Sequence, residues 1–405
     1  MNLSPPGPRT RSPIDAPAAP QPATGDARHG ALNILWVPHT SVSAEGWEGS
    51  RQYHLIRRMA AAGHRVSCVS WTQSKRLRDA LGWGRITHEA SEFGELYTIG
   101  LAPNFYRALT KAHPRPYHLA LNQALFRRAV REVYRRVRPD VLVYSSSCHF
   151  TGFPPFEFPV PMVYDYVDKT EPYVEEGYIR HAASVVAISP ELADAGRAYG
   201  KPVTLIPNGV DADRYTRISR QEAKARLGLD CGPVVSLIGL TCSHELYFVD
   251  AVAELQRERP DLALLIVGGG KMREAIVAKA ERCGIKNLQA PGSIPFPQVP
   301  VYFRATDVGL YPGEDTRYYR EASPLKVVEY VAAGARVVSS PVNLFRAGWP
   351  AVTLTDPTSD AFAAAIRAGL EAPVAAGDVS SLNDYDWAVL ADRFDQCLRR
   401  AAVRG

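Results

Sequence analysis

The sequence is poor in cysteine and has no hydrophobic run long enough to cross a membrane. Its six cysteines are scattered over 405 residues and form no C-x-x-C pair or other metal-like spacing. Cysteines of this kind are typical of reduced residues, so we expect a cytoplasmic protein rather than a disulfide-stabilised secreted one. No apolar stretch reaches the roughly 18 residues that a membrane-spanning helix needs.

Several nucleotide and metal motifs are also missing. There is no G-x-x-x-x-G-K-[ST] loop, which argues against phosphoryl transfer of the P-loop kind. The run VGGGKM at 267–272 is a poor dinucleotide fingerprint, and no D-x-D run ends a predicted strand. We therefore expect catalysis without a metal ion and without a bound cofactor.

The charge balance gives no reason to expect a nucleic acid partner. The formal net charge is +5 and 22% of the residues are charged, which is ordinary for a globular chain. The one concentrated basic stretch is FRRAVREVYRRVR at 126–138. A solvated helix face is the simpler interpretation of this stretch, and weak contact with a membrane surface or an anionic acceptor is the alternative.

The chain divides into an extension and two regions of similar pattern. Residues 1–29 hold seven prolines and no apolar core segment, so we expect them to be disordered and not to be a signal peptide. Apolar strands then alternate with helical patterns in 30–212, and the alternation restarts in 213–383. Such alternation predicts two α/β domains, each Rossmann-like with a doubly wound parallel sheet. The final helical pattern, 384–405, is expected to pack back on the first domain.

The predicted strands place the site between the two domains. They are 31–39, 64–71, 140–146, 161–167 and 184–189 in the first region, and 232–240, 262–270, 286–294, 306–312 and 335–341 in the second. Open α/β sheets bind their ligands at the carboxyl ends of the strands. We therefore expect a site in an interdomain cleft, built from the loops that follow strands.

The stretch EASPLKVVEY at 321–330 carries the clearest chemical signal. Ser323 is a suitable N-cap and Pro324 suits the first position of a helix, so Lys326 would lie in the first turn. A cation is mildly unfavourable there unless an anion lies beside it. Because the helix follows a predicted strand, its first N–H groups would face the ligand edge of the sheet and could hold a phosphate. A surface Lys–Glu pair is the simpler alternative.

With its flanking segments, this stretch resembles the GT-B nucleotide-sugar glycosyltransferases of the large group called group 1 or family 4. Two glutamates separated by seven residues are a motif of that family, and Glu321 and Glu329 fit it. The segments GWEGSRQYHLIRRMAAAGHRV, SVVAISPELAD, IPNGVDADRY and LLIVGGGKMRE are similar to its other segments, in the same order. The form SPLKVVEYVAAG is similar to a branch that includes polysaccharide-assembly transferases. The resemblance covers about residues 31–400.

This resemblance implies a retaining transferase that moves a sugar from a UDP- or GDP-sugar to an acceptor. It also implies roles for the residues of the motif. Glu329 resembles the glutamate that binds the nucleotide ribose, and Glu321 the one that contacts the transferred sugar. Ser323 and Leu325 match positions whose N–H groups meet the diphosphate or the sugar, and the side chain of Lys326 would assist them.

Three more donor-binding residues follow from the resemblance, together with one departure. Ser293 and Ile294 match the place where the base is read, and Gly239 would allow close approach to the phosphates. The family usually has an Arg and a Lys after this strand, which neutralise the leaving diphosphate, whereas the segment GLTCSHELY has neither. Lys326, Lys271 or an arginine of DTRYYRE (315–321) would have to substitute for them, or the donor is held differently.

The residues of the first domain are less sharply indicated. Gly46 and Gly49 lie where the family has a glycine pair facing the diphosphate and the acceptor, and a flexible turn is the alternative. His149 would hydrogen-bond the donor sugar or be structural. Asp165 or Asp168 would be the general base if the reaction inverted the anomeric configuration. A retaining enzyme needs no such base, because the leaving phosphate can take the acceptor proton on the same face.

Two other functions stay open at this point. A nucleotide-sugar epimerase on the same fold would need acid–base carboxylates across the sugar, which Glu321 could supply. A non-catalytic nucleotide-sugar-binding protein is the second, and the missing Arg/Lys pair is the one feature that supports it. No motif identifies the acceptor, which we expect to be a small molecule or a glycan.

Overall fold

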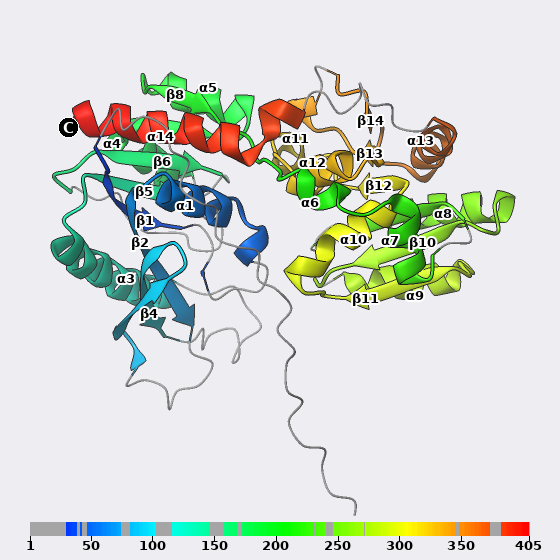
Figure 1. The fold of residues 1–405 in the computed structure, drawn as a ribbon, viewed down its shortest axis with the longest axis horizontal. Coiled ribbons are helices and arrows are strands. Elements are labelled where there is room, and N and C mark those ends of the chain that lie inside the picture. The colour runs from blue at the N-terminus through cyan, green and yellow to red at the C-terminus, as the bar shows by residue number, and fades with distance from the viewer. Residues whose placement is uncertain are drawn as a thin grey trace, which may run out of the picture.

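The computed structural model describes residues 30–38, 41–42, 47–73, 82–102, 116–145, 158–167, 172–229, 232–239, 246–270, 272–345, 348–372 and 382–404. These residues form two α/β domains that lie side by side (Figure 1). The first is built on an eight-stranded sheet and the second on a six-stranded sheet. The predicted fold class, two α/β domains with parallel sheets, is confirmed.

The sheet of the first domain has the strand order β3-β4-β2-β1-β5-β6-β7-β8. Its strands are β1 (Asn33–Val37), β2 (Arg65–Gln73), β3 (Ile86–Ser91), β4 (Gly94–Leu101), β5 (Val141–Ser145), β6 (Met162–Tyr166), β7 (Ser184–Ala187) and β8 (Val203–Leu205). All neighbouring pairs are parallel except β3 and β4, which form an antiparallel hairpin at the edge. The sequence did not predict this hairpin, because most of β3 is exposed and polar and so lacks the apolar run of a buried strand.

Helices cover both faces of this first sheet. They are η1 (Trp47–Gly49), α1 (Arg51–Ala61), α3 (Pro116–Val137), α4 (Pro172–His181) and α5 (Pro190–Ala198). Phe126 and Val130 of α3 pack with the side chains on one face of the sheet, and Leu55 and Ile56 of α1 pack with those on the other. Ser50 caps α1, its hydroxyl accepting the N–H of Tyr53 at 3.2 Å.

The second domain repeats the architecture with a fully parallel sheet of order β11-β10-β9-β12-β13-β14. Its strands are β9 (Val234–Ile238), β10 (Ala263–Val267), β11 (Leu288–Gly292), β12 (Val308–Tyr311), β13 (Arg336–Ser339) and β14 (Val352–Leu354). Its helices are α6 (Asp213–Thr216), α7 (Arg220–Leu227), α8 (Tyr247–Glu258), α9 (Arg273–Arg282), η3 (Phe296–Gln298), α10 (Val299–Ala305), α11 (Arg317–Arg320), α12 (Leu325–Ala332), η4 (Asn343–Phe345) and α13 (Ser359–Glu371).

The last helix, α14 (Trp387–Arg404), leaves the second domain and lies across the first (Figure 1). Trp387, Leu390, Phe394 and Leu398 are all buried, and they pack with residues of β1, β5, β6 and β7. The ring of Phe394 stacks on that of Trp36 with 5.1 Å between centroids. The chain therefore crosses between the domains twice, once after β8 and once before α14.

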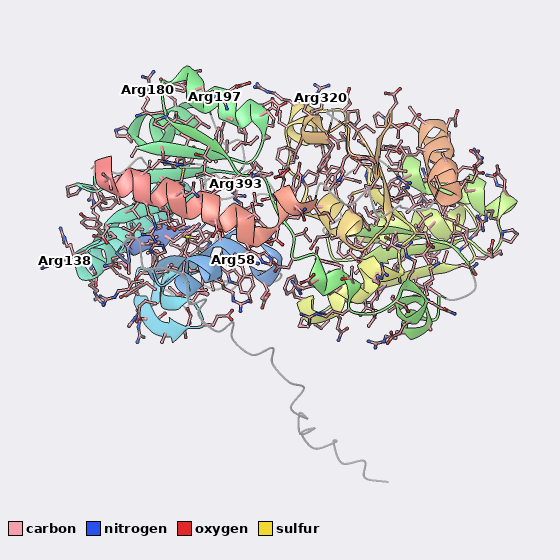
Figure 2. The ribbon with its side chains drawn as sticks, turned by 45° about the horizontal axis from the view of Figure 1, so that its top comes forward. Arg58, Arg138, Arg180, Arg197, Arg320 and Arg393 are labelled. Atoms are coloured by element: carbon pink, nitrogen blue, oxygen red, sulfur yellow. The ribbon has the colours of Figure 1, made fainter. Side chains whose placement is uncertain are left out.

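The surface of the first domain is rich in arginine. The exposed face of α3 carries Arg127, Arg128, Arg131, Arg135 and Arg136. Figure 2 shows Arg138, just beyond this helix, at the outer edge of the first domain and away from the second. Within the part of the chain that the structure describes, no helix has both the length and the apolar character needed to cross a bilayer.

Candidate active site

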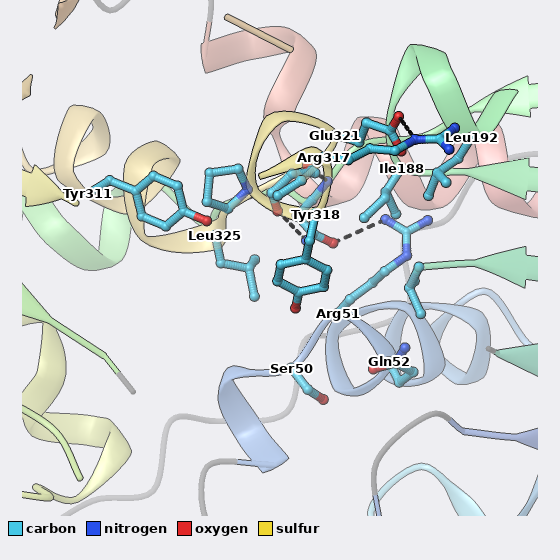
Figure 3. Close-up of a pocket in the computed structure, with 15 residues that line it drawn as sticks. Ser50, Arg51, Gln52, Ile188, Leu192, Tyr311, Arg317, Tyr318, Glu321 and Leu325 are labelled. Atoms are coloured by element: carbon cyan, nitrogen blue, oxygen red, sulfur yellow. Dashed lines mark hydrogen bonds and ion pairs between the residues drawn. The ribbon is translucent and has the colours of Figure 1, made fainter. Parts of the chain in front are cut away.

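A cavity of about 340 Å³ lies between the two domains, beside the stretch 321–325 (Figure 3). The first domain contributes the start of α1 and residues that follow β6 and β7, among them Val167 and Ile188. The second domain contributes Tyr311 at the end of β12 and the segment that leads into α12. Both walls come from the carboxyl ends of parallel strands, which is where open α/β sheets bind ligands.

Glu321 lines this cavity together with Arg317. The Nε of Arg317 donates to a carboxylate oxygen of Glu321 at 2.7 Å, four residues along the chain. The Glu321 side chain is 11% exposed and that of Arg317 is 74% exposed, so the carboxylate lies inward and the guanidinium lies in solvent. Both side chains line the cavity, and the carboxylate is the more buried of the two.

Ser323 links this loop to the crossover between the domains. Its hydroxyl accepts the backbone N–H of Asn208 at 2.9 Å, and its carbonyl accepts Nδ2 of Asn208 at 2.6 Å. The predicted N-cap is wrong by one residue, since α12 begins at Leu325 and Pro324 is its cap. The Ser323 hydroxyl does not cap the helix, because Asn208 already donates to it. Asn208 thus fixes the position of the loop that carries Glu321.

Glu329 lies on the first turns of α12 and is held by a tyrosine from α6. The hydroxyl of Tyr215 donates to its carboxylate at 2.5 Å. Burial raises the pKa of Glu329 above its usual value, and the Tyr215 hydrogen bond and the charges of Arg214 and Lys326 oppose that rise. Burial and the neighbouring carboxylate raise the pKa of Tyr215 well above its usual value, so the phenol keeps its proton. The pair presents an oriented carboxylate that can accept hydroxyl groups.

Tyr330, the next residue, fixes α12 to the sheet. Its hydroxyl accepts the N–H of Ile238 at 2.8 Å and donates to the carbonyl of Ser236 at 2.9 Å, both on β9. Its ring packs against Gly309 of β12, where a Cβ atom would lie only 2.4 Å from the ring carbons. The helix therefore cannot slide along the sheet, and Glu329 is held at the carboxyl ends of β9 and β12.

Lys326 and Gly239 are brought together at the end of β9. Gly239 has a φ of +112°, and a Cβ atom there would lie 3.1 Å from the Lys326 ammonium. The backbone carbonyl of Gly239 leaves no room for a side chain on Gly268, at the end of β10. The Lys326 ammonium also lies 5.6 Å from the centre of the Tyr311 ring. A cation thus stands beside glycine backbone, which an anionic group can approach closely.

The loop after β11 faces the first domain. Ser293 is exposed, and its hydroxyl lies 3.0 Å from where a Cβ of Gly269 would stand. Ile294 packs at the edge of the second domain's core. A Cβ on Gly49 of η1 would lie 3.4 Å from the ring of Phe296, so the two domains approach each other here. Three predicted positions, Gly49, Ser293 and Ile294, therefore lie on neighbouring segments.

The remaining predicted residues belong to the first domain. Gly46, His149 and Asp168 lie outside the described residues. Asp165 is described, and it is fully buried with one oxygen 3.2 Å from Nε of Arg51 and the other 3.0 Å from the Ser145 hydroxyl. Both oxygens have partners inside the first domain, which favours a structural role for Asp165 over the alternative that it is a general base.

Sequence reasoning missed three residues that shape the site: Arg51, Asn208 and Tyr215. Asn208 and Tyr215 stand within IPNGVDADRY, which was singled out as a segment but not for these side chains. Arg51 stands within GWEGSRQYHLIRRMAAAGHRV, which was likewise singled out as a segment but not for this side chain. Among the described residues, no group of three His, Cys, Asp or Glu side chains is placed to hold a metal ion.

Comparison with protein families matches both domains. The model described as Glycosyltransferase Family 4 matches residues 49–214, and that described as Glycosyl transferases group 1 matches residues 235–372. The chain is 30% identical over 152 residues to 2-deoxystreptamine glucosyltransferase of Streptomyces kanamyceticus, covering 34% of this chain and 39% of the relative. It is 28% identical over 225 residues to phosphatidyl-myo-inositol mannosyltransferase of Mycobacterium tuberculosis, covering 51% and 57%.

Solved structures extend this likeness to nearly the whole chain, although the aligned part spans only about half the length of the curated relatives or less. Sucrose-phosphate synthase of Thermosynechococcus elongatus superposes with a TM-score of 0.68 at 18% identity, covering 92% of this chain and 99% of that one. A protein of Anabaena solved in complex with UDP gives 0.65 at 16% identity, covering 91% and 100%. At these identities the likeness shows the shared fold. The chain belongs to the GT-B glycosyltransferases, with a family 4 domain followed by a group 1 domain.

Proposed function

We propose that the protein transfers a sugar from a nucleoside diphosphate sugar to an acceptor hydroxyl in the interdomain cavity. The observation that carries this proposal is the pair of glutamates on either side of Lys326. Glu321 lines the cavity, while Glu329 is held by Tyr215 behind it. In this proposal Glu321, at the end of α11, serves the transferred sugar, and Glu329, on α12, serves the ribose.

The donor binds mainly to the second domain, 213–383. The diphosphate lies beside Gly239, the Lys326 ammonium and the N–H groups that begin α12, which together offset its charge. Glu329 accepts the ribose hydroxyls, and the loop of Ser293 and Ile294 receives the base. UDP and GDP are both candidate nucleotides, and neither a metal ion nor a cofactor takes part.

The reaction proceeds with retention of the anomeric configuration. The acceptor hydroxyl attacks the anomeric carbon on the face from which the diphosphate leaves, so the carbon–oxygen bond to phosphate breaks as the new glycosidic bond forms. A phosphate oxygen takes the acceptor proton. Lys326 and the helix N-terminus stabilise the charge that develops on the leaving group. The alternative is inversion. It would require a carboxylate on the face of the sugar opposite the leaving diphosphate, and Asp168 would be that general base.

The acceptor binds to the first domain, 30–212, and is a small molecule or a glycan. The exposed arginines of α3 add weak peripheral contact with an anionic membrane surface, where a lipid-linked acceptor would lie. Arg138, just beyond α3, lies at the outer edge of the first domain, which supports such contact (Figure 2). We place the protein in the cytoplasm, where nucleotide sugars are the expected donors.

A panel of UDP-, GDP- and dTDP-sugars, incubated singly with the protein, tests this function. Slow release of a nucleoside diphosphate is expected for a transferase without its acceptor. A new nucleotide-sugar peak would indicate an epimerase, and binding without turnover would indicate a non-catalytic protein. Comparison of the anomeric proton coupling of donor and product by NMR then separates retention from inversion.

A further inference from the structure

Arg51 is a buried cation that lines the cavity, and one of its guanidinium nitrogens has no hydrogen-bond acceptor among the described residues. It is the first residue of α1 and is only 3% exposed. Its Nε donates to Asp165 at 3.2 Å and its Nη1 donates to the carbonyl of Pro207 at 2.8 Å. Its Nη2 is buried and has no hydrogen-bond partner among the residues that the structure describes. A buried donor of this kind costs the free energy of its lost hydration unless a ligand accepts from it.

The surroundings of this group favour an oxyanion over a neutral oxygen. Arg51 lines the cavity with Ser50 and Gln52, so the amino end of α1 also faces it. The Ser50 hydroxyl takes the N–H of Tyr53, while the N–H groups of Arg51 and Gln52 have no partner within the helix. The positive end of the helix dipole thus adds to the guanidinium. Burial lowers the pKa of Arg51 and the Asp165 carboxylate opposes that effect. An arginine guanidinium stays charged in proteins at neutral pH.

The residues around Arg51 indicate which anion it would bind. Ser323 and Leu325, at the start of the donor helix α12, line the same cavity as Arg51. Glu321, assigned to the transferred sugar, lines the same cavity as Arg51. Gly239 and Lys326, assigned to the diphosphate, lie together at the end of β9 and do not line it. In Figure 3 the Arg51 guanidinium extends from α1 toward Ile188 and Leu192 of the first domain. An anion at Nη2 would therefore lie on the acceptor side of the sugar.

We propose that Arg51, with the amino end of α1, binds a phosphate or carboxylate group carried by the acceptor. This inference rests on the proposed function and narrows it to acidic acceptors. Ile188 and Leu192 keep water away from the ion pair, which strengthens the attraction between the guanidinium and the acidic group. Asp165 offsets the charge of Arg51 and accepts from its Nε. An oxygen of the acceptor's acidic group accepts from Nη2, which has no hydrogen bond to Asp165.

The test uses Arg51→Lys, which keeps a positive charge for Asp165 but removes Nη2. Arg58→Lys is the matched control, because Arg58 is two turns along α1, pairs with Asp211 and does not line the cavity. The full-length protein is saturated with UDP or GDP so that the donor phosphate site is filled. Inorganic phosphate and acetate are then titrated by calorimetry, and thermal unfolding of each variant confirms that it is folded.

Arg51→Lys is expected to weaken phosphate or acetate binding at least about tenfold, as loss of a charged hydrogen bond implies. UDP and GDP binding, and anion binding by the Arg58→Lys control, should stay within threefold of wild type. The anion that shows the larger change identifies the acidic group. Unchanged anion binding would overturn the proposal, and so would an equal loss of nucleotide affinity, which would assign Arg51 to the leaving diphosphate.

Two further arms keep the result decisive. If Arg51→Lys does not fold, the double variant Arg51→Gln/Asp165→Asn removes both charges together and avoids a stranded buried carboxylate. It should lose anion binding as the single variant would, and retention of anion binding would overturn the proposal. Failure of wild-type protein to bind any nucleotide would contradict the proposed function, whereas anion binding titrated without nucleotide still reports on Arg51.

Discussion

The two walls of the cavity differ in the sign of the charged groups that they bury. On the second-domain side, Glu321 pairs with Arg317, Ser323 with Asn208 and Glu329 with Tyr215. On the first-domain side, the described residues include Arg51, whose Nη2 is buried without a partner. The donor half therefore presents carboxylates that can accept from sugar hydroxyls, and the acceptor half presents a buried cation with a donor that a ligand can satisfy.

The largest expected effect comes from Glu321, where the two walls meet. Glu321→Gln should lower kcat by about 100- to 1,000-fold, because it removes a charged hydrogen-bond acceptor from the sugar being transferred. The Kd for free nucleoside diphosphate should hardly change. Initial rates with a sugar donor and calorimetry with UDP and GDP measure the two quantities.

The control for this substitution is Asp315→Asn. Asp315 forms an exposed ion pair with Arg320 on the same loop and does not line the cavity. Its variant should retain wild-type turnover. A Glu321→Gln enzyme as fast as this control would remove Glu321 from the site.

Glu329 should control donor affinity. Glu329→Gln should raise the Kd for nucleoside diphosphate about 10- to 100-fold, since a charged hydrogen bond to the ribose is lost. Because burial raises the pKa of Glu329, wild-type affinity should fall as the pH is lowered through that raised pKa and the carboxylate becomes protonated. The variant should lack this pH dependence, as calorimetry over a pH series would show.

Tyr215→Phe provides a second check on the same carboxylate. The Tyr215 hydrogen bond lowers the pKa of Glu329, so its loss should move the pH dependence of nucleotide affinity toward higher pH. A pH profile that is identical in wild type and in Tyr215→Phe would contradict the account of this pair.

Lys326 and Arg317 are two candidates for the cation that neutralises the diphosphate in place of the family's usual Arg and Lys. Lys326→Met should weaken diphosphate binding about tenfold, because it removes a charge-assisted contact beside Gly239. Arg317→Gln should change it by less than about threefold, since its side chain is 74% exposed and its charge is screened. The reverse order of effects would show that the cation comes from α11.

The crossover at Asn208 should have the smallest effect on activity. Asn208→Ala should lower the free energy of unfolding by about 1–3 kcal/mol, because the carbonyl of Ser323 loses its Nδ2 donor, and should reduce kcat several-fold by loosening the Glu321 loop. Asn343→Ala is the control, as Asn343 makes a different interdomain hydrogen bond, 2.6 Å to Glu191. Urea unfolding and initial rates should show that only the Asn208 variant loses turnover.

The donor half could be predicted from sequence because its residues are close along the chain. Glu321, Lys326 and Glu329 fall within one loop and one helix, and the apolar strands beside them fix which edge of the sheet they reach. The same holds for the fold, in which long apolar runs alternate with helices. The edge hairpin β3–β4 was missed, because its exposed polar residues resemble a loop.

The remaining contacts could not be predicted, since they join residues far apart in sequence. Tyr215 and Glu329 are 114 residues apart, as are Arg51 and Asp165. Asn208 and Ser323 are 115 residues apart. No local pattern indicates such pairs. The helix starts one residue later than predicted, at Leu325. The Ser323 hydroxyl, predicted to cap the helix, accepts instead from the distant backbone N–H of Asn208.

A crystal structure of the protein with UDP or GDP tests the central claim most directly. The claim is that the stretch 321–330 holds the donor. We predict the diphosphate within hydrogen-bond distance of the Lys326 ammonium and beside Gly239, with the ribose hydroxyls on the Glu329 carboxylate. A nucleotide bound elsewhere, or bound with its ribose away from Glu329, would contradict the account.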